Sequence, residues 1–201
     1  MLLFLPRGYD AHSRRRYPLL IFLHGSGEIG SDVELLKKHG PPGFVEGQPD
    51  FPFIVASPQS KLTEARGFDP RALDAMLDEL LERLPIDRDR VYLTGLSMGG
   101  IWSYGWAALR PDRFAAIAPM SGTWDPGEAC RLKDMPIWAF HGELDESVPV
   151  NGDRAIVDAV NACGGNAKLT VYAGEGHEIW AMPYGDPGLY AWLLEHRRAA
   201  H

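Results

Sequence analysis

Apolar positions along the chain fall into two alternating patterns, which predict strands and helices in turn. Short, almost continuously apolar runs predict strands, and three of them, 18–24, 90–94 and 136–141, are apolar enough to be buried on both faces of a sheet. The predicted strands lie near 2–5, 18–24, 52–57, 90–94, 114–119, 136–141 and 167–173.

Between these runs, apolar residues recur at spacings of three and four, which predicts amphipathic helices. The clearest one follows Asp69, a predicted N-cap with Pro70 in the first helical position, and it stops before Pro85. Further helices are predicted at about 98–110, 150–163 and 187–198. Strands that alternate with helices predict an α/β fold, a mainly parallel twisted sheet of about seven strands with helices on both faces.

The pentapeptide Gly95-Leu96-Ser97-Met98-Gly99 joins a predicted strand to a predicted helix. A serine between two glycines at such a junction is the nucleophile-elbow pattern, in which a strained turn exposes the serine oxygen. Side chains at the flanking positions would collide with the neighbouring strand or helix, which explains the glycines. The pattern predicts Ser97 as a nucleophile.

A serine nucleophile needs a base and an acid that orients the base, and after an elbow they follow in the order acid, then histidine. Asp145 lies in the loop after predicted strand 136–141, and His177 lies in a glycine-flanked loop after the last predicted strand. Both positions are beyond the carboxyl ends of strands, where α/β sheets build their sites. We predict Asp145 as the orienting acid and His177 as the base; Glu143 or Glu146 is the alternative acid.

Other histidines and serines in the sequence are alternative candidates for the base and the nucleophile. His24 and His141 each end a strand before a glycine, which favours a role in holding the backbone by hydrogen bonds. His196 and His201 lie in a charged C-terminal tail and are expected to be solvated. Ser121 and Ser103 are rival nucleophiles, but neither is in an elbow.

An oxyanion hole is the second requirement of a serine nucleophile. One donor is expected to be the N–H of Met98, the residue after the nucleophile, and the other to come from the loop after an earlier strand. The glycine-rich segment 25–30 follows predicted strand 18–24, and Ser26 is the predicted second donor; a simple flexible turn is the alternative. Glu28 in this segment is expected to be structural and paired with an arginine.

Two loop tryptophans, Trp180 and Trp124, are predicted to line a substrate pocket, since Trp180 follows His177 by three residues and Trp124 follows Ser121 by three. Trp102 and Trp106 are four residues apart and are expected to belong to the core on one helix face.

Four segments together resemble the α/β-hydrolases, in particular the small esterases grouped with predicted peptidases and with feruloyl-esterase-like or phospholipase/carboxylesterase-like enzymes. They are 23–28, 95–100, 141–149 and 176–180, in the order of that family and across nearly the whole chain. The resemblance implies an α/β-hydrolase fold and a cofactor-independent esterase. Only about fifteen residues, 121–135, separate two strands where many lipases insert a helical lid, so no lid domain is expected.

Composition narrows the class of protein further. At 201 residues with 45% hydrophobic and 23% charged residues, the chain is expected to be a single soluble catalytic domain, 1–201. Its start inside predicted strand 2–5 suggests a domain excised from a longer chain. A net charge of -7 argues against nucleic acid or an anionic membrane as partner, and no apolar run is long enough to span a bilayer. The apolar segment 2–5 is too short for the core of a signal peptide, and the sequence leaves the cellular compartment of the protein open. We expect a monomer.

The two cysteines, Cys130 and Cys163, allow one disulfide and have no metal-ligand spacing, so no metal is expected. Arginine outnumbers lysine fifteen to five and there are 16 prolines, which raises the hypothesis of heat tolerance.

The expected function is hydrolysis of short-chain carboxylic esters, small-molecule substrates, by a Ser-His-Asp triad through an acyl-enzyme. The alternatives are a feruloyl or acetyl-xylan type of esterase, a serine peptidase on the same scaffold, and a non-catalytic binding module.

Overall fold

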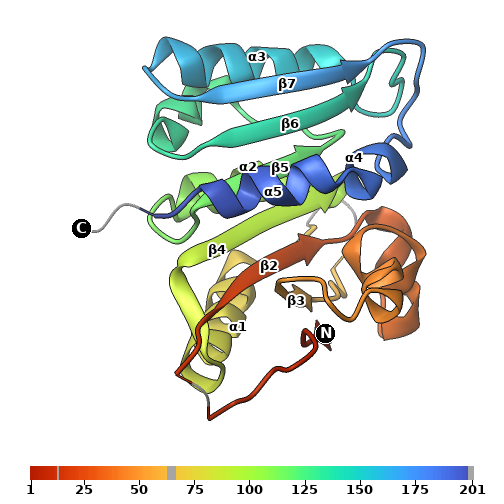
Figure 1. Ribbon diagram of the computed structural model, residues 1–201. Helices are drawn as coiled ribbons and strands as arrows, with labels where there is room; N and C mark the ends of the chain where they lie inside the picture. The colour runs from red at the N-terminus through yellow and green to blue at the C-terminus, as the bar shows by residue number, and fades with distance from the viewer. Residues whose placement is uncertain (13, 63–66, 199–201) are drawn as a thin grey trace.

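A seven-stranded sheet forms the centre of the computed structural model, which describes residues 1–12, 14–62 and 67–198 (Figure 1). The strands are β1 (Leu2–Phe4), β2 (Tyr17–Leu23), β3 (Ile54–Ser57), β4 (Ile86–Leu96), β5 (Ala116–Met120), β6 (Ile137–Gly142) and β7 (Ala167–Tyr172). They follow the order β1-β3-β2-β4-β5-β6-β7, and among the described residues β1 alone pairs antiparallel with its neighbour. The predicted mainly parallel sheet is confirmed.

The central strands are buried on both faces because their alternate side chains enter two separate hydrophobic cores. In β2, where all seven residues are buried, Leu19, Ile21 and Leu23 belong to one core. Leu20 and Phe22 belong to the other core, on the opposite face. The near-continuous apolar run in the sequence therefore reflects two cores that share one strand.

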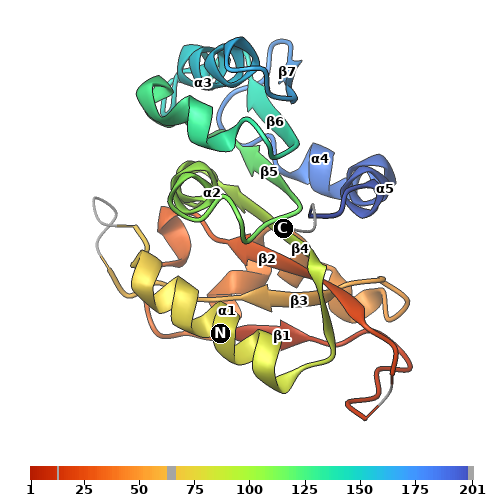
Figure 2. The ribbon, with the colours of Figure 1, turned by 90° about the vertical axis from the view of Figure 1, so that its left-hand side faces the viewer.

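Helices cover both faces of the sheet, as predicted. They are α1 (Pro70–Arg83), α2 (Met98–Leu109), α3 (Val150–Ala162), α4 (Ala181–Gly185) and α5 (Pro187–Glu195). Figure 2 shows α1, α2 and α3 on one face and α4 and α5 on the other. The predicted cap of α1 is confirmed, because the side chain of Asp69 accepts a hydrogen bond from the N–H of Arg71 at 2.9 Å.

Several predicted boundaries were wrong, each for a local reason. Strand β4 begins at Ile86 rather than 90, because Ile86 already pairs with Tyr17 of β2, ahead of a register shift that passes over the polar residues 87–90. The last helix stops at Glu195 instead of 198 and is preceded by α4, which was not predicted. His196 is only partly exposed, with its ring on Trp192 at 4.7 Å, so its predicted solvation is wrong. His201 lies outside the described residues.

Short 3-10 helices occupy segments in which the spacing of apolar residues predicts neither a helix nor a strand. Four of them lie between β2 and β3, namely η1 (Ser26–Glu28), η2 (Val33–Lys38), η3 (Pro41–Gly43) and η4 (Val45–Gly47). A fifth, η5 (Pro126–Leu132), lies between β5 and β6. Since this connection holds η5 and short turns alone, the expectation that a lid domain is missing there is confirmed.

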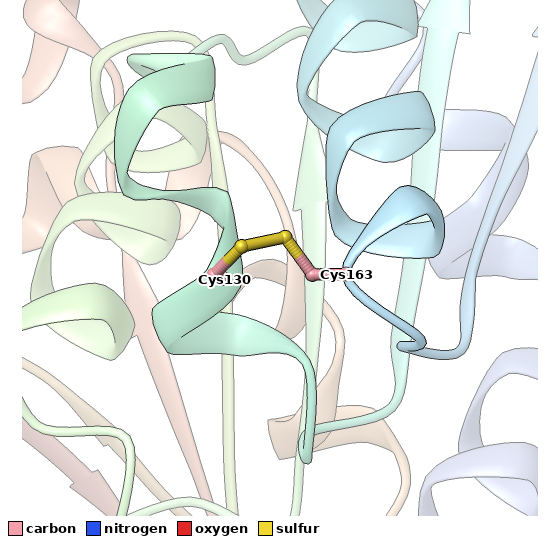
Figure 3. Close-up of a disulfide and its surroundings, with 2 residues drawn as sticks. All are labelled: Cys130 and Cys163. Atoms are coloured by element: carbon pink, nitrogen blue, oxygen red, sulfur yellow. A yellow bond between two sulfur atoms is a disulfide. The ribbon is translucent and has the colours of Figure 1, made fainter.

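A disulfide joins η5 to the end of α3, as Figure 3 shows. The Cα atoms of Cys130 and Cys163 lie 5.2 Å apart, and the bridge closes a sequence separation of 33 residues. The bridge that the sequence allowed is therefore present, with Cys130 in a 3-10 helix rather than in a loop. In the ranges that the structure describes, no helix is both long and apolar enough to cross a membrane.

Candidate functional site

Ser97 lies in a sharp turn between β4 and α2, with backbone angles φ 52° and ψ -118° that L side chains rarely adopt. Its N–H donates to the carbonyl of Met120 at 2.9 Å, which fixes the turn against β5. A Cβ on Gly95 would lie 2.4 Å from the carbonyl oxygen of Gly99, and a Cβ on Gly99 would lie 1.9 Å from that of Leu23. The two glycines are therefore required by the close approach of α2 to β4 and β2.

The three predicted triad side chains come together at the carboxyl edge of the sheet. His177 Nε2 lies 2.8 Å from Ser97 Oγ, and His177 Nδ1 lies 2.7 Å from Asp145 Oδ2. These contacts form a continuous chain of hydrogen bonds from a hydroxyl to a carboxylate. The side chain of His177 is 20% exposed, whereas that of Asp145 is buried, so substrate can reach the serine end of the chain.

Asp145 is held by backbone groups of its own loop. Its Oδ1 accepts hydrogen bonds from the N–H groups of Ser147 at 2.9 Å and Val148 at 2.8 Å. Burial by itself raises the pKa of this carboxyl, but the hydrogen bonds from His177 and the Val148 N–H outweigh burial and hold the pKa below its ordinary value. The carboxylate is thus ionised at neutral pH, as an orienting acid must be.

Ser121, a rival nucleophile in the sequence, serves another purpose. It also has a positive φ, 48°, and its buried Oγ donates to the carbonyl oxygen of His177 at 2.9 Å. The hydroxyl is committed to the backbone of the loop that carries His177. Ser103, the second rival, lies inside α2 and donates to the carbonyl of Gly99 at 2.7 Å.

The predicted oxyanion donors lie on two adjacent turns. Met98 is the first residue of α2, so its N–H has no partner within the helix, and Ser26 is the first residue of η1 after β2. The turns are in contact, because a Cβ on Gly99 would lie 2.8 Å from the carbonyl of His24. The sheet therefore brings both predicted donors to the elbow from neighbouring strands.

Glu28, at the end of η1, is buried, and in the part of the chain that the structure describes its ion-pair partner is a histidine rather than the predicted arginine. Its Oε1 lies 3.9 Å from Nε2 of His39. Burial raises the pKa of Glu28, and the charge of His39 partly offsets that rise. The prediction of a structural role stays open, with His39 as the partner.

The two predicted pocket tryptophans are placed differently. Trp180 is buried, with its ring edge-on to His177 at 5.5 Å and close to His39 at 5.4 Å. Trp124 packs on Trp102 at 6.2 Å and its Nε1 donates to Glu128 at 2.9 Å. The structure therefore brings Trp180 to the triad, while the contacts of Trp124 are with α2 and η5.

A cavity of about 890 Å³ lies between η3–η4 and α4–α5. Its lining includes Phe44, Phe51, Tyr184 and Tyr190, and also Ala181, the sequence neighbour of Trp180, but none of the triad side chains. Within the described ranges, no group of three or more histidine, cysteine or acidic side chains is arranged to hold a metal ion.

Two buried groups beside the triad were missed by sequence reasoning. His141 was expected to bind only the backbone, and its Nε2 does lie 2.7 Å from the carbonyl of Val148, but it also lies 3.1 Å from Asp145 Oδ2. Its Nδ1 lies 2.8 Å from Oδ2 of Asp153. The position of Asp153 offered a signal, because an acid three residues before Ile156 falls on the apolar face of the predicted helix.

The sheet order and the strand–turn–helix at Ser97 define the chain as an α/β-hydrolase. Comparison with protein families then identifies the group: the chain belongs to the phospholipase/carboxylesterase family, whose model matches residues 54–184. The family that the sequence motifs suggested is confirmed.

Individual proteins agree with this assignment. The chain is 30% identical over 156 residues to the probable feruloyl esterase C of Aspergillus terreus, covering 75% of this chain and 56% of that protein. A crystal structure of a thermostable esterase superposes with a TM-score of 0.82 at 31% identity, covering 98% of this chain and 58% of that one. Est1E from Butyrivibrio proteoclasticus, solved with ferulic acid bound, has the same fold, with a TM-score of 0.69 at 16% identity over 96% of this chain and 93% of that chain. The chain spans little more than half the length of the first two.

Proposed function

We propose that this protein is a serine carboxylesterase whose nucleophile is Ser97, base is His177 and orienting acid is Asp145. The observation that carries the proposal is the continuous chain of two hydrogen bonds, 2.8 Å and 2.7 Å, that links the three side chains. Membership of the phospholipase/carboxylesterase family supports it independently.

In the proposed mechanism, Ser97 Oγ attacks the ester carbonyl carbon while His177 Nε2 takes the hydroxyl proton. Asp145 keeps the Nδ1–H of His177 oriented and stabilises the imidazolium that forms. The N–H groups of Met98 and Ser26 bind the tetrahedral oxyanion, and each contributes roughly 3 kcal/mol to the transition state. His177 then protonates the leaving alcohol, and a water molecule, activated by the same base, releases the acid and frees Ser97.

Esters with short acyl chains are the proposed substrates. The connection between β5 and β6 holds only η5 and turns, so there is no lid domain to shelter a long chain as in many lipases. Esters of aromatic acids are a second candidate, favoured by the feruloyl esterase relative and by the aromatic lining of the cavity next to Trp180.

The test is hydrolysis of p-nitrophenyl esters from acetate to palmitate, together with methyl ferulate. The wild type is compared with Ser97→Ala and with Ser103→Ala, which makes the same substitution in the helix that follows Ser97 without touching the triad. We expect turnover of acetate to hexanoate, a loss of several orders of magnitude in Ser97→Ala, and wild-type rates in Ser103→Ala.

Each result discriminates between the candidates. A kcat/KM for methyl ferulate above that for the butyrate ester assigns the protein to the aromatic-acid esterases. Comparable turnover of palmitate and butyrate contradicts the short-chain proposal. No turnover of any ester by the wild type rejects the esterase and leaves the peptidase and binding alternatives, for which peptide substrates come next.

A further inference from the structure

His141 lies directly behind the triad, fully buried at the end of β6. Its Nε2 faces two acceptors, the carbonyl oxygen of Val148 at 2.7 Å and Asp145 Oδ2 at 3.1 Å. A ring nitrogen that faces only acceptors must carry a proton. Without the proton, its own lone pair would face the lone pairs of the acceptor oxygens where no water can separate them. Nε2 of His141 is therefore a donor, whatever the state of the other ring nitrogen.

The other ring nitrogen is held by a second buried acid. Nδ1 of His141 lies 2.8 Å from Oδ2 of Asp153, which is in the first turn of α3 and fully buried. The hydroxyl of Tyr104, on α2, donates to the other oxygen of Asp153. Three elements, β6, α3 and α2, thus meet in one hydrogen-bonded cluster behind Asp145.

The pKa shifts of His141, Asp153 and Tyr104 indicate where the protons of this cluster lie. Burial by itself lowers the pKa of His141, but the hydrogen bond and charge of Asp153 outweigh it, so the pKa is raised. Burial also raises the pKa of Asp153 and, well above its ordinary value, that of Tyr104. Both shifts favour a proton held between His141 and Asp153, and Tyr104 is a neutral donor.

Three hydrogen bonds and one buried ion-pair contact therefore hold Asp145. Two backbone N–H groups, of Ser147 and Val148, bind Oδ1, and two histidines, His177 and His141, meet at Oδ2. The backbone bonds fix one oxygen, and the histidine behind fixes the direction in which the second oxygen faces His177. A carboxylate with both oxygens bound in this way cannot rotate about its Cβ–Cγ bond without breaking a contact.

We propose that His141 is a positioning residue for catalysis: it holds Asp145 in the orientation that accepts the Nδ1–H of His177, with Asp153 and Tyr104 as its anchor. This inference rests on the proposed function, because it concerns the acid of that triad. It differs from a purely structural role, in which His141 would only close the loop through the carbonyl of Val148.

Two isosteric substitutions separate these roles. In His141→Asn the amide takes the place of Nδ1 and retains the contact with Asp153, but no donor reaches Asp145. In His141→Gln the amide nitrogen takes the place of Nε2, so the donor to Asp145 and Val148 is kept while the contact with Asp153 is lost. Both variants are compared with the wild type, Ser97→Ala and His196→Asn, a partly buried histidine on Trp192 outside the site.

With the butyrate ester, we expect kcat of His141→Asn to fall about tenfold or more, with KM unchanged, since the 3.1 Å contact of a ring N–H with the Asp145 carboxylate is lost. His141→Gln recovers most of that loss. The acid limb of kcat/KM moves to higher pH in His141→Asn alone, because Asp145, with one donor fewer, holds the proton on His177 more tightly. His196→Asn behaves as the wild type.

Equal kcat values and pH profiles for His141→Asn and the wild type overturn the positioning role while the esterase proposal stands. An inactive wild type, or an active Ser97→Ala, overturns the esterase proposal instead. If His141→Asn does not fold, 15N NMR of the histidine rings in the wild type decides the matter. The proposal requires a protonated Nε2 on His141 at pH 7, and an unprotonated Nε2 contradicts it.

Discussion

The dipeptide His-Gly follows strand β2 directly and closes strand β6, at the same edge of the sheet, yet the two histidines are held in opposite ways. Nδ1 of His24 lies 2.6 Å from the carbonyl of Gly25, and Nε2 accepts the N–H of Ser60 at 2.9 Å. His24 is therefore neutral, and burial lowers its pKa. His141 instead faces two carboxylates and a carbonyl, and its pKa is raised.

The difference shows that the partners, rather than the local sequence, decide what a buried histidine does. At the carboxyl end of β2, which is followed by the predicted oxyanion donor Ser26, backbone groups bind the neutral ring of His24. We call this region the β2 end, and the region around His141 and Asp145 the β6 end. The β6 end, which carries Asp145, is organised by ionisable side chains around a shared proton. We therefore expect changes at the β2 end to affect mainly stability and changes at the β6 end to affect mainly catalysis.

The largest expected effect is at the β6 end, in Asp145→Asn. The amide of asparagine presents a donor where two histidine N–H groups meet, so His177 adopts the wrong tautomer, and kcat should fall by about 10³ to 10⁴ with the fold intact. Steady-state kinetics with the butyrate ester, with circular dichroism for the fold, measures it. Glu146→Gln is the matched control, and a larger loss there would transfer the acid role to Glu146.

The disulfide should have the next largest effect, on stability alone. Cys163 caps the end of α3, whereas Asp153 is in its first turn, so the bridge anchors the helix far from the triad. A disulfide that closes a loop over a sequence separation of 33 residues should raise the free energy of unfolding by roughly 3 to 4 kcal/mol. The double variant Cys130→Ser/Cys163→Ser should lose about that amount in urea unfolding and keep its kcat at 25 °C.

The prolines and arginines of the chain raise the hypothesis that the intact protein tolerates heat. A melting temperature above about 55 °C would support that proposal. Reduction of the wild type should lower the melting temperature to that of the double variant; an unchanged value after reduction would show that the bridge contributes little.

Strong local patterns made most of the fold predictable. The elbow around Ser97 requires its glycines for contacts that any strand-to-helix turn of this kind makes, and Asp145 and His177 follow strands whose apolar runs are unmistakable. The 3-10 helices between β2 and β3 were missed because a turn of three residues has no periodicity to detect.

The cluster behind Asp145 could not be predicted because it is made of contacts between distant segments. Tyr104 and Asp153 are 49 residues apart in the sequence, and they meet only because the fold places α2 and α3 on the same face of the sheet (Figure 2). The pairing of Glu28 with His39 is another example, since nothing local distinguishes a histidine from an arginine as the partner of a buried acid. The protonation of His24 and His141 depends on the same kind of contact.

A smaller effect is expected at the β2 end, in His24→Asn. The amide nitrogen replaces Nδ1 and keeps the bond to the Gly25 carbonyl, while the buried N–H of Ser60 loses its acceptor. The free energy of unfolding should fall by about 1 to 3 kcal/mol, and kcat should fall less than in His141→Asn. A larger loss of kcat in His24→Asn than in His141→Asn would show that the β2 end matters more for catalysis than the β6 end, contrary to this prediction.

The smallest effect is the pH dependence of stability, which should have opposite sign at the two ends. Because the folded pKa of His24 lies below its unfolded value of about 6.5, its contribution is full above that pH and is lost as the pH falls. The folded pKa of His141 is raised, so its contribution is full below about 6.5 and is lost as the pH rises through the folded pKa. Each slope is at most about 1.4 kcal/mol per pH unit. Urea unfolding of the wild type, His24→Gln and His141→Gln between pH 5 and 8.5 gives both differences, and slopes of the same sign would show that the two rings share one protonation state.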